Sequence, residues 1–273
     1  MYNDPSMNRR MFLMMPIAGA ALPAPDRTLT VKLRTRVELF KGSGVWQEVS
    51  AARDFQIANT AMLVCDMWDK HWCSGATIRV AAMAPKMAAF HAEARKHGMS
   101  IIHSPSDVME FYKDSPQRKF MEKFGGVPLE KGLALEDPPL PIDDSKGGCD
   151  TGDSFYKAWS RQHPSIPIAA NDMISDKGAE IYPMLKSRGI TNLFVMGVHT
   201  NICVLNRSFA IKQMTKLGMH CVLVRDLTDA MYDPNTKPFV THDQGTQMVI
   251  EHIEKYWCPS ALSTDIAAAL RKS

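Results

Sequence analysis

The chain lacks the charge pattern of a nucleic-acid-binding protein. Its net charge is +3 at pH 7 over 273 residues, and it has no Lys/Arg-rich patch interleaved with aromatic side chains. Low-complexity segments and internal repeats are also absent, which excludes a repeat architecture. Hydrophobic residues make up 45% and charged residues 22%, which is typical of a globular protein with a large core. We therefore expect its partner to be a small molecule and not a nucleic acid.

The chain also lacks the paired cysteines of a zinc site. None of its six cysteines belongs to a CxxC motif, and their spacings fit no zinc pattern. Cys65 and Cys221 lie inside strand-like apolar runs, where a thiol is an inert core group. Cys73, Cys149 and Cys258 lie near predicted turns, and disulfide pairing among these three stays open.

The chain lacks an apolar segment long enough to span a membrane: the run within residues 8–24 is too short, and no other segment is long and apolar enough. Residues 8–24 read NRRMFLMMPIAGAALPA, in which Arg9 and Arg10 precede a short apolar run and then small residues. This order is typical of a twin-arginine export signal, with cleavage after Ala20 or Ala24. We predict such a signal over residues 1–24. The protein is then periplasmic or exported, with no membrane contact after signal removal; a cytoplasmic location is the alternative.

Apolar runs alternate with segments of helical spacing over residues 58–273. Continuous apolar runs, typical of buried parallel strands, occupy residues 61–65, 100–103, 193–198 and 221–224. Helical spacing occupies residues 80–96, 178–187, 201–217 and 241–256. This alternation predicts one α/β domain, a three-layer α/β/α arrangement with a mostly parallel, doubly wound sheet.

Two further segments do not follow this alternation. Residues 28–40 and 45–49 read as two strands of a hairpin, which we expect to form a small N-terminal β addition (residues 25–57) outside the main sheet. Residues 104–157 are rich in Pro, Gly and Asp and have no clear period. A segment this long in a compact domain is usually functional or contains elements that the pattern hides.

One cysteine, Cys203, lies where a helix is expected to begin after a buried strand. The run LFVMGVHTNICVL (193–205) leads through a Gly turn into this position. A helix N-terminus favours a thiolate, and its free N–H groups can hold an oxyanion. Asp66 ends another apolar strand, and ligands of open α/β sheets bind at the carboxyl ends of strands where the strand order reverses. If the order switches between these two strands, an acid and a thiol face each other across a crevice.

Two motifs resemble the isochorismatase-like cysteine hydrolases, the superfamily that includes nicotinamidases. The run TAMLVCDMWD (60–69) is similar to that family's first strand and acid, and GVHTNICVLNRSFAIKQMTKLGMHCVLVRDLTDA (197–230) to its nucleophile segment. The resemblance implies a six-stranded parallel sheet and an Asp–Lys–Cys triad, with Asp66 as the acid and Cys203 as the nucleophile. It also implies a cis peptide bond at Val198–His199, which would aim the N–H groups of His199 and Cys203 at a carbonyl oxygen.

The lysine of that triad has no match in this chain. The corresponding region, AWSRQHPSIPI (158–168), contains none. His163, before Pro164, is the best match as third catalytic residue, with Arg161 second and Lys157 more distant. A histidine can assist ionisation of the thiol, whereas an arginine stabilises a thiolate but stays protonated.

The metal motif of the nicotinamidases is also incomplete. The resemblance places an Asp-x-His arrangement after the second strand, where this chain reads IIHSPSDVMEF (101–111), and the spacing of His103 and Asp107 is wrong. We therefore expect no metal and no cofactor.

The residues near the two motifs are candidates for substrate binding. They are Trp68, Asp69, His71, Asn201 and Arg161. Trp68, Asp69 and His71 follow the acid and either line the pocket or form a surface loop. Asn201 either contacts substrate or caps the helix.

These residues together predict a hydrolase that cleaves a C–N bond of a small amide-like molecule through a thioester acyl-enzyme. The alternatives are an isochorismatase-type vinyl-ether hydrolase and a non-catalytic small-ligand binder, the second because the family lysine is missing. We also expect a homo-oligomer, since relatives commonly assemble.

Overall fold

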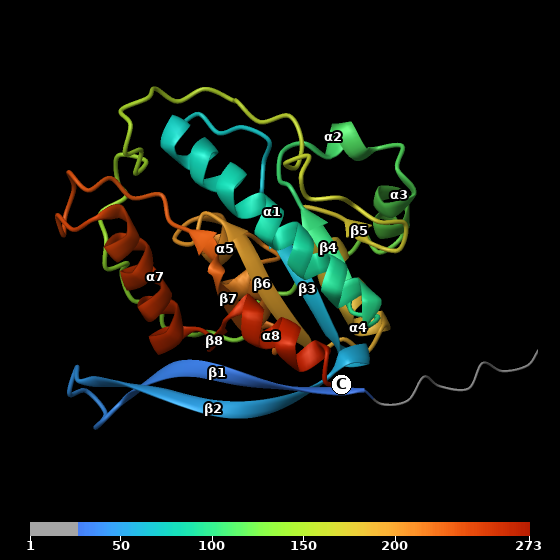
Figure 1. Ribbon diagram of the computed structural model, residues 1–273, viewed down its shortest axis with the longest axis horizontal. Helices are drawn as coiled ribbons and strands as arrows, with labels where there is room; N and C mark the ends of the chain where they lie inside the picture. The colour runs from blue at the N-terminus through green and yellow to red at the C-terminus, as the bar shows by residue number, and fades with distance from the viewer. Residues whose placement is uncertain (1–26) are drawn as a thin grey trace, which may run out of the picture.

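The computed structural model describes residues 27–273, so the export signal expected over residues 1–24 lies outside the described residues. One sheet of eight strands runs through the molecule in the order β2-β1-β8-β7-β6-β3-β4-β5 (Figure 1). Among the helices of residues 27–273, none is both long and apolar enough to cross a membrane.

Six strands form the parallel part of the sheet, as the alternation of strands and helices predicts. Every neighbouring pair from β8 to β5 is parallel. These strands are β3 (Thr60–Cys65), β4 (Ser100–Ser104), β5 (Met173–Ile174), β6 (Asn192–Val198), β7 (His220–Asp229) and β8 (Ser260–Ala261). β3 and β6 are buried along their whole length, which explains why they read as unbroken apolar runs.

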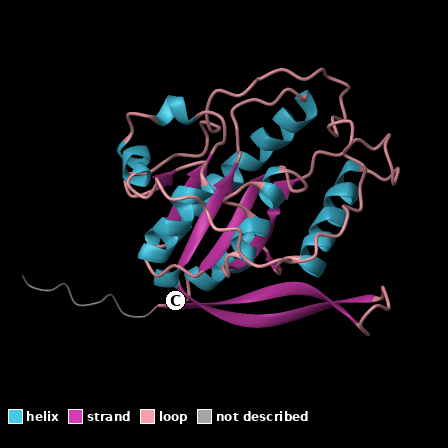
Figure 2. Cartoon of the chain, turned by 180° about the vertical axis from the view of Figure 1, so that it is seen from behind, coloured by secondary structure: helices cyan, strands magenta, loops and turns pink. Residues whose placement is uncertain are grey.

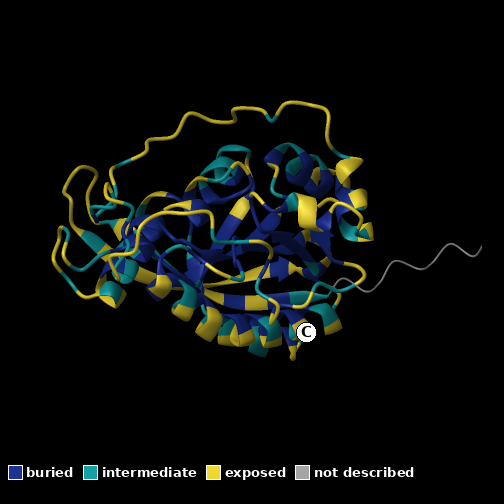
Figure 3. Ribbon diagram, turned by 90° about the horizontal axis from the view of Figure 1, so that it is seen from above, coloured by how far each residue is buried: buried dark blue, intermediate teal, exposed yellow. Residues whose placement is uncertain are grey.

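Helices cover both faces of this sheet, which confirms the three-layer fold. Met62 and Val64 of β3 pack on one side with α1 (Ser74–Lys96) and α8 (Ser263–Leu270). Leu63 points the other way, because successive side chains alternate along a strand, and it packs with α4 (Gly178–Ser187), α6 (Ile211–Lys216) and α7 (His242–Tyr256). Seen from behind, helices again lie over the strands (Figure 2), and buried residues fill the middle of the molecule (Figure 3).

The N-terminal hairpin belongs to the sheet, so the prediction that it lies outside is wrong. Strands β1 (Thr28–Glu38) and β2 (Trp46–Gln56) pair antiparallel, and Arg34 of β1 pairs with Ser260 of β8. Alternate residues of β1, including Leu29 and Val31, are buried in the same core as α1 and α8. The Nε atom of Arg34 also donates to the Glu254 carboxylate of α7 at 2.8 Å. Apolar burial and this ion pair together explain why the hairpin joins the sheet.

The helix predicted over residues 201–217 is broken into two. Residues Cys203–Asn206 form α5, and α6 begins only at Ile211. Arg207 leaves the helical conformation, with a ψ angle of 152°, and its side chain turns to Asp66. The hydroxyl of Ser208 accepts the N–H of Gly178 at the start of α4. These two tertiary contacts compete with continuation of the helix.

The segment without a sequence period contains little regular structure. After β4 come two short helices, α2 (Met109–Tyr112) and α3 (Pro116–Glu122). A long irregular stretch follows α3. A 3-10 turn, Ile57–Asn59, precedes β3. The irregular stretch returns to the carboxyl ends of the strands, where Gln162 pairs with Trp68 in an isolated β-bridge. It therefore forms part of the edge at which ligands of such sheets bind.

Gly197 is where β6 approaches β3 most closely. Its φ angle is +113°, and a Cβ at this position would lie 1.9 Å from the carbonyl oxygen of Cys65. We expect Gly197→Ala to destabilise the protein by about 3 kcal/mol or more, because strained backbone and overpacking add. Urea denaturation measures this change.

Gly218→Ala is the matched control. Gly218 also has a positive φ, +83°, but a Cβ there would meet no atom within 4 Å. It should cost only the left-handed backbone penalty of roughly 1 kcal/mol. Equal losses in the two variants would contradict the close contact of β6 with β3.

Candidate active site

Asp66 and Cys203 meet where the strand order reverses. β3 pairs with β4 on one side and with β6 on the other, so the switch point predicted between the two strands is present. Asp66 follows β3, and Cys203 begins α5 after the end of β6. The thiol and the carboxyl are within hydrogen-bonding reach of each other, so the acid and the thiol face each other as the sequence predicts.

Asp66 is fully buried and has three polar contacts. Its Oδ1 accepts the N–H of Ser106 at 2.6 Å, and its Oδ2 accepts the Nε–H of Arg207 at 3.2 Å. Burial raises the pKa of this carboxyl above its ordinary value, while Arg207, the Cys203 thiol and Ser106 oppose the rise. The group is therefore a stronger base than an exposed aspartate, and its anion still has partners.

The thiol of Cys203 is protonated at rest. Burial raises its pKa, the negative charge of Asp66 raises it further, and the Arg207 charge and the His199 N–H act in the opposite direction. We expected the start of a helix to favour the thiolate, and this expectation is wrong: α5 has only four residues, and burial outweighs its end. Cys203 thus needs a base to lose its proton.

Arg207 is the cation of the group, and our sequence reasoning missed it. Burial lowers its pKa, but the charges of Asp66, Cys203 and Asp107 outweigh this and raise it overall. Its Nη2 lies 3.2 Å from Oδ2 of Asp107. The signal in the sequence is the spacing of four residues from Cys203, which places the two side chains one turn apart.

The three residues considered for the lysine position lie elsewhere. Within residues 27–273, no hydrogen bond or ion pair joins His163, Arg161 or Lys157 to Asp66. The Nδ1 of His163 accepts the N–H of Ser165, and the Arg161 guanidinium lies 5.6 Å above the Phe111 ring. The ammonium of Lys157 donates to the backbone carbonyl of Asp107 at 3.1 Å. Asp107 is the residue whose carboxylate contacts Arg207.

The peptide bond Val198–His199 is cis, as the resemblance implies. The N–H of the following residue, His199, points at the sulfur of Cys203. The His199 ring is buried, and its Nε2 has no hydrogen-bond partner among the described residues. A backbone donor therefore lies beside the thiol, on a residue whose buried ring nitrogen is unsatisfied.

A series of packed rings begins at His199. The His199 ring meets the edge of His71 at 4.8 Å, and His71 stacks on Trp159 at 5.7 Å. Trp159 in turn stacks on Trp68 at 4.5 Å. Burial lowers the pKa of His71 to about 4 and that of His199 to about 3, so both imidazoles are neutral near pH 7. Trp68 and His71 were predicted pocket residues; Trp159 was not.

The two remaining predicted binding residues hold loops in place. The Asp69 carboxylate accepts the backbone N–H of Ser160 at 2.9 Å. The Asn201 amide bonds to the Asp144 carboxylate and to both backbone groups of Met231. Asn201 does not cap α5, whose N-cap is Ile202. The polar atoms of Asp69 and Asn201 are thus used in fixing the segments around the site.

Solved structures with the same α/β/α architecture match this chain. A cysteine hydrolase from Pseudomonas syringae pv. phaseolicola 1448A matches with a TM-score of 0.54 at 14% sequence identity, over 80% of this chain and 95% of that chain. The chain has the isochorismatase-like fold. An isochorismatase from Pseudomonas putida KT2440 matches with a TM-score of 0.49 at 15% identity, over 77% of this chain and 91% of that chain. No protein-family model and no curated protein sequence matches.

The isochorismatase-like fold brings Asp66 and Cys203 together here, but with an arginine in contact with the acid. In this chain the cation that contacts Asp66 comes from the segment of Cys203, four residues beyond that cysteine, and not from the region of residues 158–168. Arg207 stays protonated at any pH the protein tolerates. It can therefore stabilise anions in this fold but cannot carry a proton between them.

The charges around Cys203 predict opposite effects of two substitutions on alkylation by iodoacetamide. Asp66→Asn removes the charge that raises the thiol pKa, so alkylation near pH 8 should be about 10-fold faster than in the unchanged protein. Arg207→Gln removes the charge that lowers it, so alkylation should be slower by a similar factor. Peptide mass spectrometry at Cys203 gives both rates.

The control for access is Asp69→Asn, which alters a nearby loop without touching the thiol. Its alkylation rate should equal that of the unchanged protein. If Asp66→Asn slowed alkylation, the charge coupling between Asp66 and Cys203 would be wrong.

Proposed function

We propose that this chain is a cysteine hydrolase that cleaves a C–N bond of a small amide-like molecule through a thioester at Cys203. The supporting observation is the buried Asp66 carboxylate, which contacts the thiol on one side and the Arg207 guanidinium on the other. A structural cysteine in a core needs neither partner. The isochorismatase-like fold, shared with a cysteine hydrolase, supports the same reading.

Asp66 acts first as the base. It takes the thiol proton as the sulfur of Cys203 attacks the substrate carbonyl carbon, and the carbonyl oxygen becomes an oxyanion. The N–H groups of His199 and Cys203 hold that oxyanion. Asp66 then returns the proton to the leaving nitrogen as the C–N bond breaks. Water, deprotonated by Asp66, attacks the thioester and releases the acid and the thiol.

Arg207 gives the buried anion of each step a positively charged partner. Before the attack, the anion beside the guanidinium is Asp66; after proton transfer, it is the sulfur or the oxyanion. A buried charge without a partner costs several kcal/mol, so a fixed cation near both anions lowers the barrier between the two states. An arginine suits this role because it does not compete for the proton.

The surroundings favour a neutral, small substrate. Both His71 and His199 are neutral near pH 7. The Nδ1 of His71 accepts the N–H of Cys73 at 3.2 Å, so the Nε2 of this neutral ring carries the proton and is a donor. A cavity of about 450 Å³, a size that suits a small molecule, opens beside His71 and Trp72. Asp66, His199 and Cys203 do not line it, and His71, whose ring packs against His199, lies between it and the thiol's surroundings. The carbonyl oxygen of an amide can accept a hydrogen bond from the Nε2 donor of His71.

The alternative without a thiol step is acid cleavage of a vinyl ether. That reaction needs Asp66 protonated, and burial does raise its pKa. The contact with Arg207 opposes protonation, however, and favours the carboxylate that a base requires. A non-catalytic binder would keep the pocket but show no turnover.

Cys203→Ala should lower kcat/KM by about 10³-fold or more on any amide that the protein hydrolyses. A set of small carboxamides, with ammonia release as the assay, identifies such a substrate. Acyl-enzyme trapped by acid quench should map to Cys203 by mass spectrometry. Cys221→Ala, at a buried thiol remote from Asp66, is the control and should keep full turnover. Full activity in Cys203→Ser would exclude the covalent route, and vinyl-ether cleavage by Cys203→Ala would favour acid catalysis.

The pH dependence of kcat/KM should report Asp66 as the base. Because burial raises its pKa above 3.8, activity should fall as the pH drops through that raised value, earlier than for an ordinary aspartate. In Arg207→Gln the acid limb should move to higher pH, because the guanidinium lowers this pKa. Arg161→Gln is the matched control and should leave the limb unchanged. A shift to lower pH in Arg207→Gln would contradict the assignment.

A further inference from the structure

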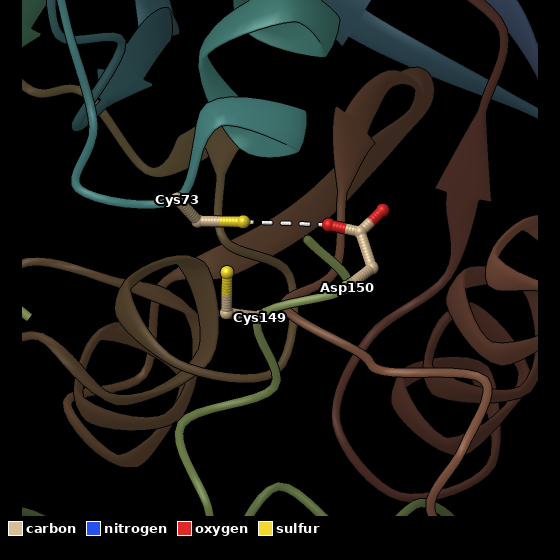
Figure 4. A group of neighbouring side chains, drawn as sticks. All are labelled: Cys73, Cys149 and Asp150. Atoms are coloured by element: carbon tan, nitrogen blue, oxygen red, sulfur yellow. Dashed lines mark hydrogen bonds between the residues drawn. The ribbon is translucent and has the colours of Figure 1, made fainter. Parts of the chain in front are cut away.

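A second pair of thiols, separate from Cys203, lies at the start of α1. Cys73 is the N-cap residue of that helix and is fully buried, while Cys149 belongs to the irregular segment and is partly exposed. In Figure 4 the sulfur of Cys149 points toward the side chain of Cys73. The two sulfurs lie within 4.8 Å of each other, and each is 3.4 Å from the hydroxyl of Thr151.

A carboxylate beside this pair raises the question of a metal. Asp150 lies within 4.8 Å of both sulfurs, so the three could in principle hold a cation. Its Oδ2, however, lies 2.6 Å from the Arg79 guanidinium and 3.8 Å from the His242 ring, and its Oδ1 lies 3.3 Å from Arg79. A metal ion would have to displace or repel these positive groups. Two thiols alone are an incomplete set for zinc, which takes four ligands.

We propose that Cys73 and Cys149 form a disulfide that ties the start of α1 to the irregular segment. The sulfur of Cys149 points toward Cys73, whose own sulfur donates to Oδ1 of Asp150 at 3.3 Å. Formation of the bond therefore requires Cys73 to leave this contact and the two sulfurs, which are within 4.8 Å, to approach each other. The other thiols lack this combination: Cys65, Cys221 and Cys258 are buried in the core clusters.

The chemistry requires an oxidant, and a small-molecule disulfide such as glutathione disulfide supplies it. Cys149 attacks one sulfur as a thiolate and forms a mixed disulfide, releasing one thiol; Cys73 then loses its proton, attacks the Cys149 sulfur and releases a second thiol. The protein loses two protons and two electrons, which the oxidant gains as it is reduced to two thiols.

The environments of the two sulfurs fit this order of attack. Burial raises the pKa of Cys149, but hydrogen bonds from Cys73 and Thr151 outweigh it and lower that pKa overall. Burial raises the pKa of Cys73. The partly exposed thiol is therefore the attacking group, and the buried one resolves the mixed disulfide.

The bond would fix a segment that contacts residues next to the candidate active site. One residue before Cys149, Gly148 lies so close to Met231 that a Cβ would be 2.3 Å from its carbonyl oxygen. The same segment carries Asp144, which binds the amide of Asn201, two residues before Cys203. The disulfide would hold these contacts without using the catalytic thiol.

The test oxidises the full chain with glutathione disulfide, blocks free thiols with N-ethylmaleimide in denaturant and maps the peptides by mass spectrometry. We expect one linked peptide pair containing Cys73 and Cys149, and the link should disappear in Cys149→Ser and in Cys73→Ser. Cys258→Ser is the matched control and should keep it. Because Cys149 is partly exposed, Cys149→Ser keeps the test valid even if Cys73→Ser fails to fold.

Two physical readouts accompany the map. Oxidation should slow tryptic cleavage after the exposed Lys146 several-fold, and it should raise the Tm by about 5–10 °C in the unchanged protein but not in Cys149→Ser. A mixed disulfide at Cys149 that Cys73 does not resolve would overturn the proposal. So would stoichiometric Zn²⁺ binding to the reduced protein that needs both cysteines and prevents their oxidation.

Discussion

The candidate site depends on the direct pairing of β3 with β6. Six backbone positions of the two strands are in register, from Thr60 with Asn192 to Cys65 with Gly197. At the last position the chains approach so closely that only glycine fits. Asp66 leaves one strand and His199 the other from this point, so the acid, the backbone donor and the thiol are positioned by sheet geometry rather than by loops.

Burial then determines what these groups can do. It raises the pKa of both Asp66 and Cys203, which disfavours any state with two anions. One guanidinium, that of Arg207, faces the pair, so the site has one stabilised negative charge at a time. A proton can therefore move between oxygen and sulfur with little change in electrostatic energy, whereas a preformed thiolate beside a carboxylate is unfavourable. The arrangement favours general-base activation over a reactive resting thiolate.

The sequence predicts well the elements whose pattern is local. β3, β6 and α4 read correctly because a buried parallel strand is an unbroken apolar run and an amphipathic helix has its own period. Strands β5 and β8 have two residues each, too few for any period. Membership of β1 in the sheet depends on its pairing with β8 and on Glu254, far away in sequence, and so has no local signal.

The same distinction explains which site residues could be predicted. Asp66 and Cys203 follow strands, so the topology rule for parallel sheets locates them. The cation could not be found in this way, because the topology rule locates residues that directly follow strands, whereas Arg207 lies within the expected helix over residues 201–217. That helix is broken by the contacts of Arg207 with Asp66 and of Ser208 with Gly178, both distant in sequence. The search for a replacement lysine followed position along the chain, but electrostatics requires only a positive charge near the carboxylate, from whichever segment can reach it.

The six cysteines show how local exposure separates thiol chemistries within one fold. Cys203 is only 7% exposed and its pKa is raised, so an external disulfide finds little thiolate there. Cys149 is more exposed, and its pKa is lowered. Since thiol–disulfide exchange proceeds through an accessible thiolate, oxidants should react at Cys149 before Cys203. In the proposed mechanism Asp66 activates Cys203 when substrate is bound, and the burial that makes this base necessary also protects the thiol from oxidants.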